Sequence, residues 1–589
     1  MGLRAASVRH PLPIVTKEST HRFGPRSQNG EWEFRLWAPI RGDIALELDN
    51  DVAIPMPFNA EDCRKVLSRA RPGARYQFHI GDGARVPDPA ARAQDGDIGD
   101  PSLIVDPQAY HWGCDDWCGR PWEETILYEL HVGLLGGFEG VAAQLERVAR
   151  LGFTAVELMP VADFPGRRNW GYDGVLPFAP DCAYGTPDQL KLLVDRAHSL
   201  DLMVFLDVVY NHFGPDGNRI REYAPQFFRS DLQTPWGGAI DFREPMVRRF
   251  FIENAIYWLT EFRFDGLRLD AVHAIRDENF LLELAAEVRA GVAANRHVHL
   301  VVENDDNDSR VLRNGFDAQW NDDFHHALHV LLTRETAAYY SDYSDAPTRA
   351  MARALSEGFV YQGEFSQHQG AVRGTPSVDL PPTAFVSFLQ NHDQIGNRAF
   401  GERLIVLADP QALRAAIALQ LLCPQIPLVF MGEEAGAREP FLYFTDHNPE
   451  LAEAVRKGRR QEFARFPEFA DPRQRERIPD PNAPETFERS RPSFEGAHAV
   501  AWNHFYSKLL RLRREQIIPR LKGARAQGAD MLGEGAVLAR WRMGDGARLS
   551  LAINLGTEQV LGDFPDCAPV WGEIGPNLKV NSTVVWIES

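Results

Sequence analysis

Eight short apolar segments, separated by stretches with helical periodicity, recur through the middle of the chain. Apolar runs of this length are typical of buried strands, and strands that alternate with helices pair in parallel. Eight such units predict a closed TIM (β/α)8 barrel and an α/β fold class. The segments are ILYELHV from Ile126, FTAVELMP from Phe153, LMVFLDVV from Leu202, GLRLDAV from Gly266, HVHLVVEN from His297, GFDAQW from Gly315, TAFVSFL from Thr383 and PLVFMG from Pro427.

The clearest helical pattern between these strands is PMVRRFFIENAIYWLTEF. Its apolar residues recur every three or four positions, which predicts a helix that packs on the barrel. Insertions such as Asn211 to Glu244 make the predicted barrel longer than the roughly 250 residues usual for this fold. The apolar stripe consists of Val247, Phe250, Phe251, Trp258, Leu259 and Phe262.

Strand-like patterns flank the barrel on both sides. EFRLWAP and RYQFHIG alternate apolar and polar residues, and a Pro, Gly and Asp-rich connection follows over Val86 to Ser102. Beyond residue 500, a basic helix, FYSKLLRLRREQI, precedes VLARWRM, RLSLAINL and TVVWIE. We predict three domains: an N-terminal, glucan-binding-like β-sandwich over 1–105, the catalytic barrel over 106–500, and a C-terminal helix with a small β-sandwich over 501–589.

The charge balance and the apolar runs exclude several classes of protein. The chain has 82 acidic and 63 basic residues, a net charge of -19, which repels nucleic acids and anionic membranes. The first residues lack the run of about 7 to 15 apolar residues of a secretory signal. The apolar stretch from Ala416 is broken by Pro424 and Pro427. Of six cysteines only Cys114 and Cys118 lie close together. We expect a cytoplasmic protein with no nucleic-acid or membrane partner.

Polar residues stand where the predicted barrel strands end, which is where barrel enzymes place their catalytic groups. A single acid at such a point is usually solvated or caps a helix. Three acids that follow the fourth, fifth and seventh strands, each within a polar segment, indicate catalysis instead. The strand-end residues are Asp207 and His212 after the third strand, Arg268 and Asp270 after the fourth, Glu303 after the fifth, and His392 and Asp393 after the seventh.

Two of these acids fit the two roles of a retaining glycosidase, a nucleophile and a general acid held about 5 to 5.5 Å apart. Asp270 is the predicted nucleophile, because Arg268 lies on the same side of its strand and keeps the carboxylate ionised. Glu303 is the predicted acid and later base, because its acidic neighbours Asp305 and Asp306 should raise its pKa.

Asp393 is the predicted third carboxylate. It is placed to accept hydrogen bonds from sugar hydroxyls and to favour the distorted, oxocarbenium-like ring, a role that transfers no proton. His212 and His392 are predicted to donate to the same sugar. The three carboxylates together predict an enzyme that cleaves or transfers α-glucosidic bonds with retention.

The same residues resemble the α-amylase superfamily of glycoside hydrolases, whose four signature regions match DVVYNH, GLRLDAVH, VVEN and FLQNHD in order. The resemblance covers nearly the whole chain and is greatest to the malto-oligosyltrehalose trehalohydrolase family, through ILYELHVG, NWGYDG, WNDDFHHALHV, QNHDQIGNR and YFTDHNPEL. It implies a barrel between two β domains. It also implies hydrolysis of the α-1,4 bond next to a terminal trehalose, with Asp270, Glu303 and Asp393 as the catalytic carboxylates.

The resemblance also implies further contacts to an oligosaccharide substrate. Trp170 and Tyr172 in NWGYDG are expected to stack on a glucose face, with core packing as the alternative for each. Asp322, Asp323, His325 and His326 in WNDDFHH offer metal-ligand atoms, yet the resemblance implies no metal and no cofactor, and sugar hydroxyls use the same groups. The other predicted substrate-binding residues are Arg268, His212, His392, Asp207, Asn211, His273, Gln394, Asn397 and Arg398.

Three departures from the family pattern affect the expected edges of the site. GLLGGFEG is shorter than the usual loop after the first strand, VEND replaces an Ala-Glu-Asp run, and GEEAGA lacks an aromatic residue.

A 1,4-α-glucan branching enzyme, or another α-glucan transferase, is the alternative function, because it uses the same three acids. HDQIGNR and WNDDFHH favour the hydrolase. A glucan-binding protein without catalysis would be expected to have lost an acid. A malto-oligosyltrehalose synthase is a possible functional partner.

Overall fold

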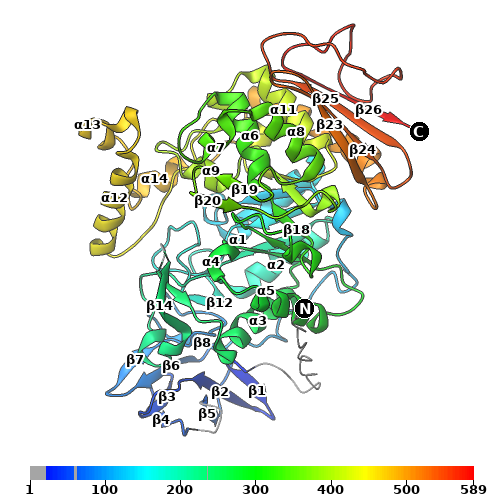
Figure 1. Ribbon diagram of the computed structural model, residues 1–589. Coiled ribbons are helices and arrows are strands. Elements are labelled where there is room, and N and C mark those ends of the chain that lie inside the picture. Colours follow the sequence, from blue (N-terminus) through cyan, green and yellow to red (C-terminus); the bar gives the residue numbers. More distant parts are fainter. Residues whose placement is uncertain (1–21, 59–62, 235–236) are drawn as a thin grey trace, which may run out of the picture.

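The structure, a computed structural model, describes residues 22–58, 63–234 and 237–589. The first 20 residues, in which we found no secretory signal, lie outside the described part of the chain. A β domain, a barrel and a second β domain follow one another along the sequence, with the barrel in the middle (Figure 1).

Eight parallel strands close into the barrel, which confirms the predicted fold. Each of the eight predicted segments supplies one strand. Gly266 begins the fourth, where a Cβ atom would lie 2.2 Å from a ring carbon of Phe205 and 2.9 Å from the carbonyl oxygen of His299. In order around the barrel the strands are β9 (Leu127–Leu130), β10 (Ala155–Leu158), β13 (Met203–Val208), β16 (Gly266–Leu269), β17 (His299–Val302), β18 (Ala318–Trp320), β21 (Phe385–Ser387) and β22 (Ile426–Phe430).

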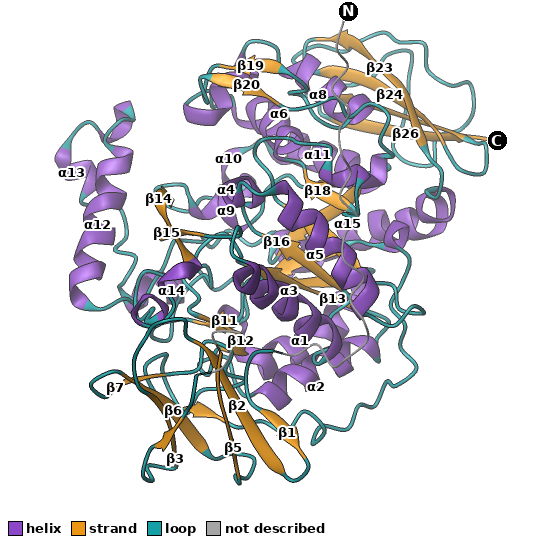
Figure 2. Ribbon diagram, turned by 60° about the horizontal axis from the view of Figure 1, so that its bottom comes forward, coloured by secondary structure: helices purple, strands orange, loops and turns teal. Residues whose placement is uncertain are grey.

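Helices surround the barrel strands (Figure 2). Between β17 and β18 the described chain has only a 3-10 turn, Val311–Arg313, so this crossover departs from the regular pattern. The helices are α1 (Gly137–Leu151), α2 (Pro187–His198), α3 (Pro245–Thr260), α5 (Glu278–Gly291), α6 (Asp322–Thr333), α8 (Pro347–Glu357), α11 (Pro410–Leu422) and α15 (Ala497–Leu512).

Helix α3 is the helix predicted from its apolar stripe. Glu244 caps its N-terminus by accepting a hydrogen bond from the backbone N–H of Met246, and Pro245 occupies the first turn, where its missing N–H costs nothing. Val247, Phe250 and Phe251 are buried, as are the other residues of the stripe. The prediction that this stripe packs in the core is therefore confirmed.

The N-terminal domain consists of two antiparallel sheets that face each other. The ring centroids of Phe34 and Tyr76, both buried, lie 5.1 Å apart between the sheets. This confirms the predicted sandwich. One sheet contains β1 (Arg26–Gln28), β2 (Glu31–Trp37) and β5 (Cys63–Ser68), and the other β3 (Ile44–Leu48), β4 (Ile54–Pro55), β6 (Arg75–Ile80), β7 (Ala84–Val86) and β8 (Ser102–Leu103).

The C-terminal domain has one antiparallel sheet in the described residues, where we expected a sandwich. One face packs on α8 and α11 of the barrel. The loop over residues 555–581 covers the other face with apolar side chains; Phe564 stacks on Trp586 at 5.8 Å. An irregular loop thus replaces a second sheet. The strands are β23 (Arg525–Gly533), β24 (Ala536–Arg542), β25 (Arg548–Asn554) and β26 (Ser582–Glu588).

Helix α15, which we assigned to the C-terminal domain, packs against α1 and α11, so by its contacts it belongs with the barrel helices.

No helix in the described residues is long and apolar enough to cross a membrane.

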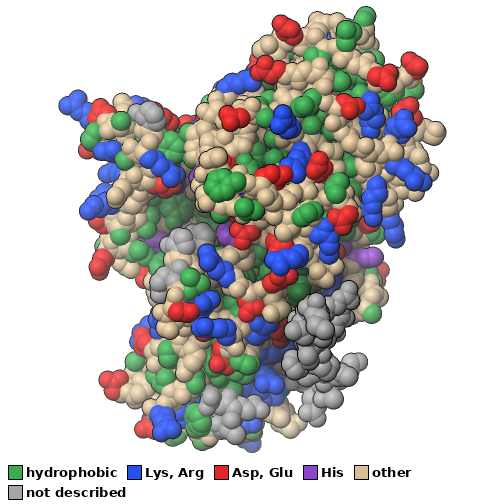
Figure 3. Space-filling model, viewed as in Figure 1, with side chains coloured by type: hydrophobic (Ala, Val, Ile, Leu, Met, Phe, Trp, Pro, Cys, Tyr) green, Lys and Arg blue, Asp and Glu red, His purple; other side chains and the backbone are tan. Residues whose placement is uncertain are grey.

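Several insertions lie between the barrel strands and helices. After β22 a lobe formed by α12 and its neighbours projects from the side of the barrel, and the surface is hollowed between this lobe and the body (Figures 1 and 3). The inserted elements are β11 (Ala162–Asp163), β12 (Leu176–Pro180), β14 (Phe228–Thr234), β15 (Gly237–Ile240), α4 (Val272–Ile275), α7 (Ser341–Ser344), β19 (Glu364–Ser366), β20 (Ala371–Arg373), α9 (His392–Gly396), α10 (Leu404–Leu407), α12 (Pro449–Phe463), α13 (Pro472–Arg475) and α14 (Pro484–Arg489).

Candidate active site

A cavity of about 580 Å³ lies at the C-terminal ends of the barrel strands. Asp270, Glu303 and Asp393 all line it, so the structure brings the three predicted carboxylates together. The first two directly follow the neighbouring strands β16 and β17, and the third follows β21 at the start of α9. This is the end of a TIM barrel at which catalytic groups are found.

One guanidinium group links the carboxylates. The Arg268 side chain, 1% exposed, donates to Asp270 Oδ1 at 2.9 Å and to Glu303 Oε2 at 2.5 Å. It also donates to Asp207 Oδ2 at 2.6 Å, and its plane lies over the Trp320 ring at 4.1 Å. A planar guanidinium in such a setting fixes several carboxylates in one geometry. Asp270 and Glu303 are therefore held next to each other by a common partner.

Asp270 stays ionised although it is buried. Burial alone raises a carboxyl pKa, but Arg268 and His212 act against it, and Asn211 donates to Asp270 Oδ2 at 2.8 Å. The net effect lowers the pKa of Asp270 below its ordinary value. An ionised carboxylate is the form that attacks a sugar carbon, so the geometry agrees with the predicted nucleophile.

Glu303 has the opposite shift. Burial is the largest cause that raises its pKa well above the ordinary value, and Asp270 and Asp393 add to it against the opposing charge of Arg268. The direction is the one predicted, but the cause differs: we expected Asp305 and Asp306 to raise it, whereas the charges that act are those across the cavity. Asp270 and Asp393 follow other strands of the barrel, so they come close to Glu303 in space although they are distant from it in the sequence.

A strained backbone residue orients Glu303. Ala271 adopts φ +40° and ψ 51°, a left-handed conformation that is unusual for a residue with a side chain. In this conformation its N–H donates to Glu303 Oε2 at 3.0 Å. Strain of this kind concentrates at functional sites, where surrounding contacts hold it in place.

A hydrogen-bonded chain supports the side of the cavity next to Asp393. Glu129 Oε1 lies 2.5 Å from His392 Nδ1, and His392 Nε2 lies 2.9 Å from the hydroxyl of Tyr172, which donates to Asp207 Oδ2 at 2.6 Å. Burial lowers the pKa of His392, but the charge and hydrogen bond of Glu129 together with the charge of Asp393 outweigh it, so the net shift is upward. Both ring nitrogens of His392 therefore have protein partners, and the ring orients Tyr172.

Asp393 itself is anchored by helix α9. Asn391 caps this helix through hydrogen bonds from the backbone N–H groups of Asp393 and Gln394. The Asp393 Oδ1 atom accepts a hydrogen bond from Asn397 at 2.7 Å, and burial raises the pKa of this carboxyl.

The structure places twelve of the predicted residues in the wall of the cavity. Trp170 contributes only part of its ring, because it is 5% exposed, stacks on Phe441 at 5.2 Å and donates to the carbonyl of Leu442. The other eleven are Tyr172, His212, Arg268, Asp270, His273, Glu303, Asp322, His392, Asp393, Gln394 and Asn397.

Five predicted residues do not line this cavity. Asp207 and Asn211 lie behind it and hold Arg268 and Asp270. The other three use their polar atoms inside the protein: Asp323 accepts from Arg373 and Tyr343, His325 contacts the Leu389 carbonyl and Tyr340, and Arg398 pairs with Glu335. Asp323 and His325 of WNDDFHH therefore have separate partners inside the protein, whereas Asp322 faces the cavity.

Sequence reasoning missed one side of the cavity. Tyr443, Val455, Arg459 and Glu462 line it from α12 and the chain before it, and Tyr339 and His368 line it as well. His326 of WNDDFHH, which the sequence suggested only as a possible metal ligand, also lines the cavity. The α12 segment has no strand-end position, so nothing in its pattern predicted a site. Glu129 had a signal: it is a charge within the apolar strand LYEL, and a buried charge needs a partner.

We expect kcat/KM to depend on pH through two limbs, one set by Asp270 and one by Glu303. On the acid side, activity should fall as Asp270 is protonated. This limb should lie below pH ~3.9, the ordinary pKa of Asp, because the pKa of Asp270 is lowered. On the basic side, activity should fall as Glu303 loses its proton. This limb should lie above pH ~4.3, the ordinary pKa of Glu, because the pKa of Glu303 is raised. Initial rates against pH, with the folded state checked by circular dichroism, measure both limbs. A basic limb near 4.3 would contradict the assignment of Glu303.

Comparisons with known proteins agree with this geometry. A family described as "Alpha amylase, catalytic domain" matches residues 99–226, and a "Domain of unknown function (DUF3459)" matches residues 524–572. A solved structure described as a putative alpha amylase from Salmonella typhimurium superposes with a TM-score of 0.91 at 42% identity, over 96% of this chain and 99% of that one. Pullulanase from Paenibacillus barengoltzii, at 18% identity and a TM-score of 0.69, shares the fold.

Curated relatives cover the chain almost completely. Malto-oligosyltrehalose trehalohydrolase of Deinococcus radiodurans is 38% identical over 93% of this chain and 92% of its own length. The protein of the same name from Saccharolobus solfataricus is 38% identical over 84% of this chain and 87% of its own length. A 1,4-alpha-glucan branching enzyme of Corynebacterium jeikeium matches only 42% of the chain, at 33% identity. The chain therefore belongs to the malto-oligosyltrehalose trehalohydrolase family.

Proposed function

We propose that this protein hydrolyses the α-1,4-glucosidic bond next to the terminal trehalose of malto-oligosyltrehalose, with retention, and releases trehalose and a malto-oligosaccharide. The observation that carries the proposal is the pair of carboxyl groups, Asp270 and Glu303, that Arg268 binds at the ends of neighbouring strands. Their pKa values are shifted in opposite directions, because burial and the neighbouring acids raise that of Glu303 against the charge of Arg268. A pair of carboxyl groups with divergent pKa values supplies the acid and the nucleophile of a glycosidase.

In the first step Asp270 attacks the anomeric carbon of the malto-oligosaccharide. A bond forms between this carbon and a carboxylate oxygen, the bond to O4 of the trehalose breaks, and Glu303 transfers its proton to that oxygen. Trehalose leaves as the neutral alcohol. Glu303 is then ionised and next to a glycosyl ester of Asp270.

In the second step Glu303 takes a proton from water, which attacks the same carbon. The bond to Asp270 breaks, and the malto-oligosaccharide leaves with its original anomeric configuration. Asp393 accepts hydrogen bonds from sugar hydroxyls through both steps and stabilises the positive ring, while the face of Tyr172 packs against a glucose.

The products distinguish hydrolysis from transfer. With maltopentaosyl-trehalose we expect free trehalose and maltopentaose, and with amylose we expect no new α-1,6 branches. Chromatography of the sugars and debranching of the amylose product measure the two outcomes. Branches formed without release of trehalose would instead favour a 1,4-α-glucan branching enzyme.

We infer that the protein acts in trehalose biosynthesis in the cytoplasm, after an enzyme that converts the reducing end of a malto-oligosaccharide to trehalose. The free thiols of Cys114 and Cys118 are compatible with a reducing compartment. Functional pairing with such a synthase follows from the chemistry of the substrate alone.

A further inference from the structure

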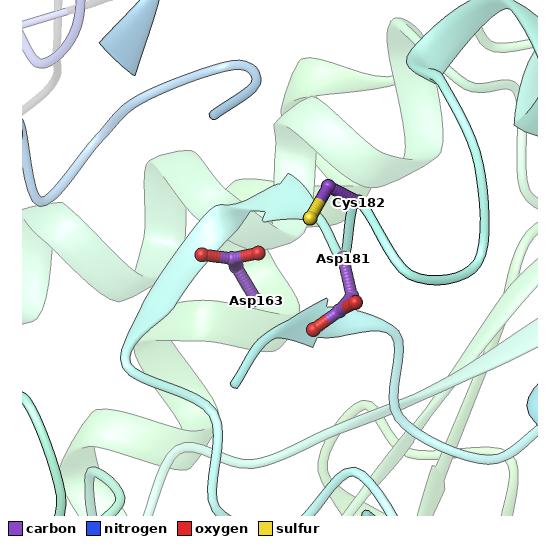
Figure 4. A group of neighbouring side chains, drawn as sticks. All are labelled: Asp163, Asp181 and Cys182. Atoms are coloured by element: carbon purple, nitrogen blue, oxygen red, sulfur yellow. The ribbon is translucent and has the colours of Figure 1, made fainter. Parts of the chain in front are cut away.

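A second group of acidic side chains lies apart from the active-site cavity, in the insertion after β10. Asp163 is the last residue of β11, and Asp181 and Cys182 directly follow β12, which pairs antiparallel with β11. One possible ligand atom of each of the three residues lies within 4.8 Å of the other two. Figure 4 shows the three side chains around one small space.

The carboxylate of Asp163 is buried without a side-chain partner. It is 1% exposed, and among the residues that the structure describes no side chain donates to either of its oxygens; the backbone N–H of Cys182 is the one donor that acts on it. The charged groups that act on it most are Asp181, Asp97 and Asp100, which are all acidic. A buried carboxylate with like charges around it requires either a cation or a proton.

Asp181 is held firmly beside it. Its Oδ1 accepts from the backbone N–H of Ala183 at 2.7 Å and its Oδ2 from that of Phe164 at 3.0 Å, and the residue is 1% exposed. Each carboxylate oxygen has a second lone pair, so these bonds position the group and leave acceptor sites unused.

The connection between the N-terminal domain and the barrel closes over this group. Cys182 Sγ donates to the carbonyl oxygen of Gly96 at 3.0 Å, and Asp97 accepts from the backbone N–H of Gly166 at 3.2 Å. These residues belong to the segment DGDIGD, part of the Pro, Gly and Asp-rich connection. Oxygen atoms from two domains therefore meet at one place.

We propose that Asp163 and Asp181 bind a divalent cation of the hard, oxygen-binding class, such as Ca²⁺, between the β11–β12 insertion and the connection to the N-terminal domain. Carboxylate and carbonyl oxygens are the ligands that this class prefers. A soft metal such as Zn²⁺ would require Cys182 as a thiolate ligand, but its Sγ donates to the carbonyl oxygen of Gly96 at 3.0 Å, so the thiol is already engaged as a donor.

The cation would stabilise a segment that also reaches the active site. The chain between β11 and β12 carries Trp170 and Tyr172, and the Tyr172 hydroxyl contacts Asp207 and His392. The proposal does not depend on which glycosidic bond is cleaved, and binding of the cation is measured without any substrate.

The test is thermal unfolding of the full chain after treatment with EDTA and dialysis. Adding CaCl₂ should raise the Tm by about 2 to 4 °C, the size expected for a ligand in excess over its Kd. Asp163→Asn should lose this response, whereas Asp530→Asn, an exposed acid of the C-terminal sheet paired with Arg540, should keep it. Cys182→Ser should also keep the rise in Tm with Ca²⁺. The assignment to a hard cation would be wrong if this variant lost the Ca²⁺ response and the unmodified chain also responded to Zn²⁺.

Isothermal titration of CaCl₂ into the EDTA-treated, unmodified chain tests the site even where a variant does not fold. We expect binding of Ca²⁺ with a stoichiometry of about one. No binding heat and no Tm shift would overturn the proposal, and an Asp163→Asn variant as stable as the unmodified chain would then show that Asp163 and Asp181 share a proton.

Discussion

Replacing Asp270 with Asn should reduce kcat on malto-oligosyltrehalose by about 10⁴ to 10⁶-fold, the range seen when a covalent nucleophile is removed. An amide oxygen does not form the glycosyl ester, although Asn has the shape of Asp and can still accept from Arg268 and lie beside Asn211. The fold should therefore persist. Release of trehalose measures kcat, and thermal unfolding shows that the variant is folded.

Chemical rescue identifies the missing group. Asp270→Gly leaves space on the face from which Asp270 attacks, so azide should restore cleavage of an activated α-glycosyl fluoride and give the β-configured glycosyl azide. Glu278→Gln is the matched control, because Glu278 lies in the first turn of α5 and pairs with Arg310. Activity of Asp270→Asn within tenfold of the unmodified enzyme would mean that another group is the nucleophile.

Replacing Glu303 with Gln should reduce kcat/KM on the natural substrate by about 10² to 10⁴-fold, the usual contribution of a general acid. Trehalose is a poor leaving group without a proton, whereas fluoride leaves unaided. The first step should thus be preserved on an α-maltosyl fluoride, and the glycosyl-enzyme should accumulate because the base of the second step is also missing. Rapid-quench measurement of fluoride release detects this burst.

Asp308→Asn is the control for Glu303→Gln. Asp308 lies five residues further along the same loop, pairs with Arg310 and does not line the cavity, so its loss should leave kcat/KM near the unmodified value. The assignment of Glu303 fails if the natural substrate and the fluoride lose activity equally, because a general acid matters in proportion to the basicity of the leaving group.

Periodicity predicted the fold well where burial is uniform. The eight barrel strands are buried on both faces and mostly apolar, and the α3 stripe faces the core along its whole length, so apolar residues mark where each element packs. The C-terminal domain shows the limit. One face of its sheet is covered by the loop that contains Phe564, and irregular chain has no period by which to recognise it.

The candidate site was predicted only in part. The strand-end rule identified Asp270, Glu303 and Asp393, because parallel strands of a barrel end on one face. The family resemblance added Asp323 and His325, which lie on α6 beside the cavity residue Asp322 but point into the protein. Helical neighbours face different directions, about 100° apart, so one motif contains both wall residues and core residues.

The sequence by itself determined the barrel, the order of its strands and the residues at their ends, because each follows from local apolar patterns along the chain. Tertiary structure alone decided how those residues work. Arg268 contacts Glu303 from 35 positions away, and Glu129 contacts His392 from 263 positions away. Their hydrogen bonds, their burial and the resulting pKa shifts depend on distances through space, and these exist only once the barrel has closed.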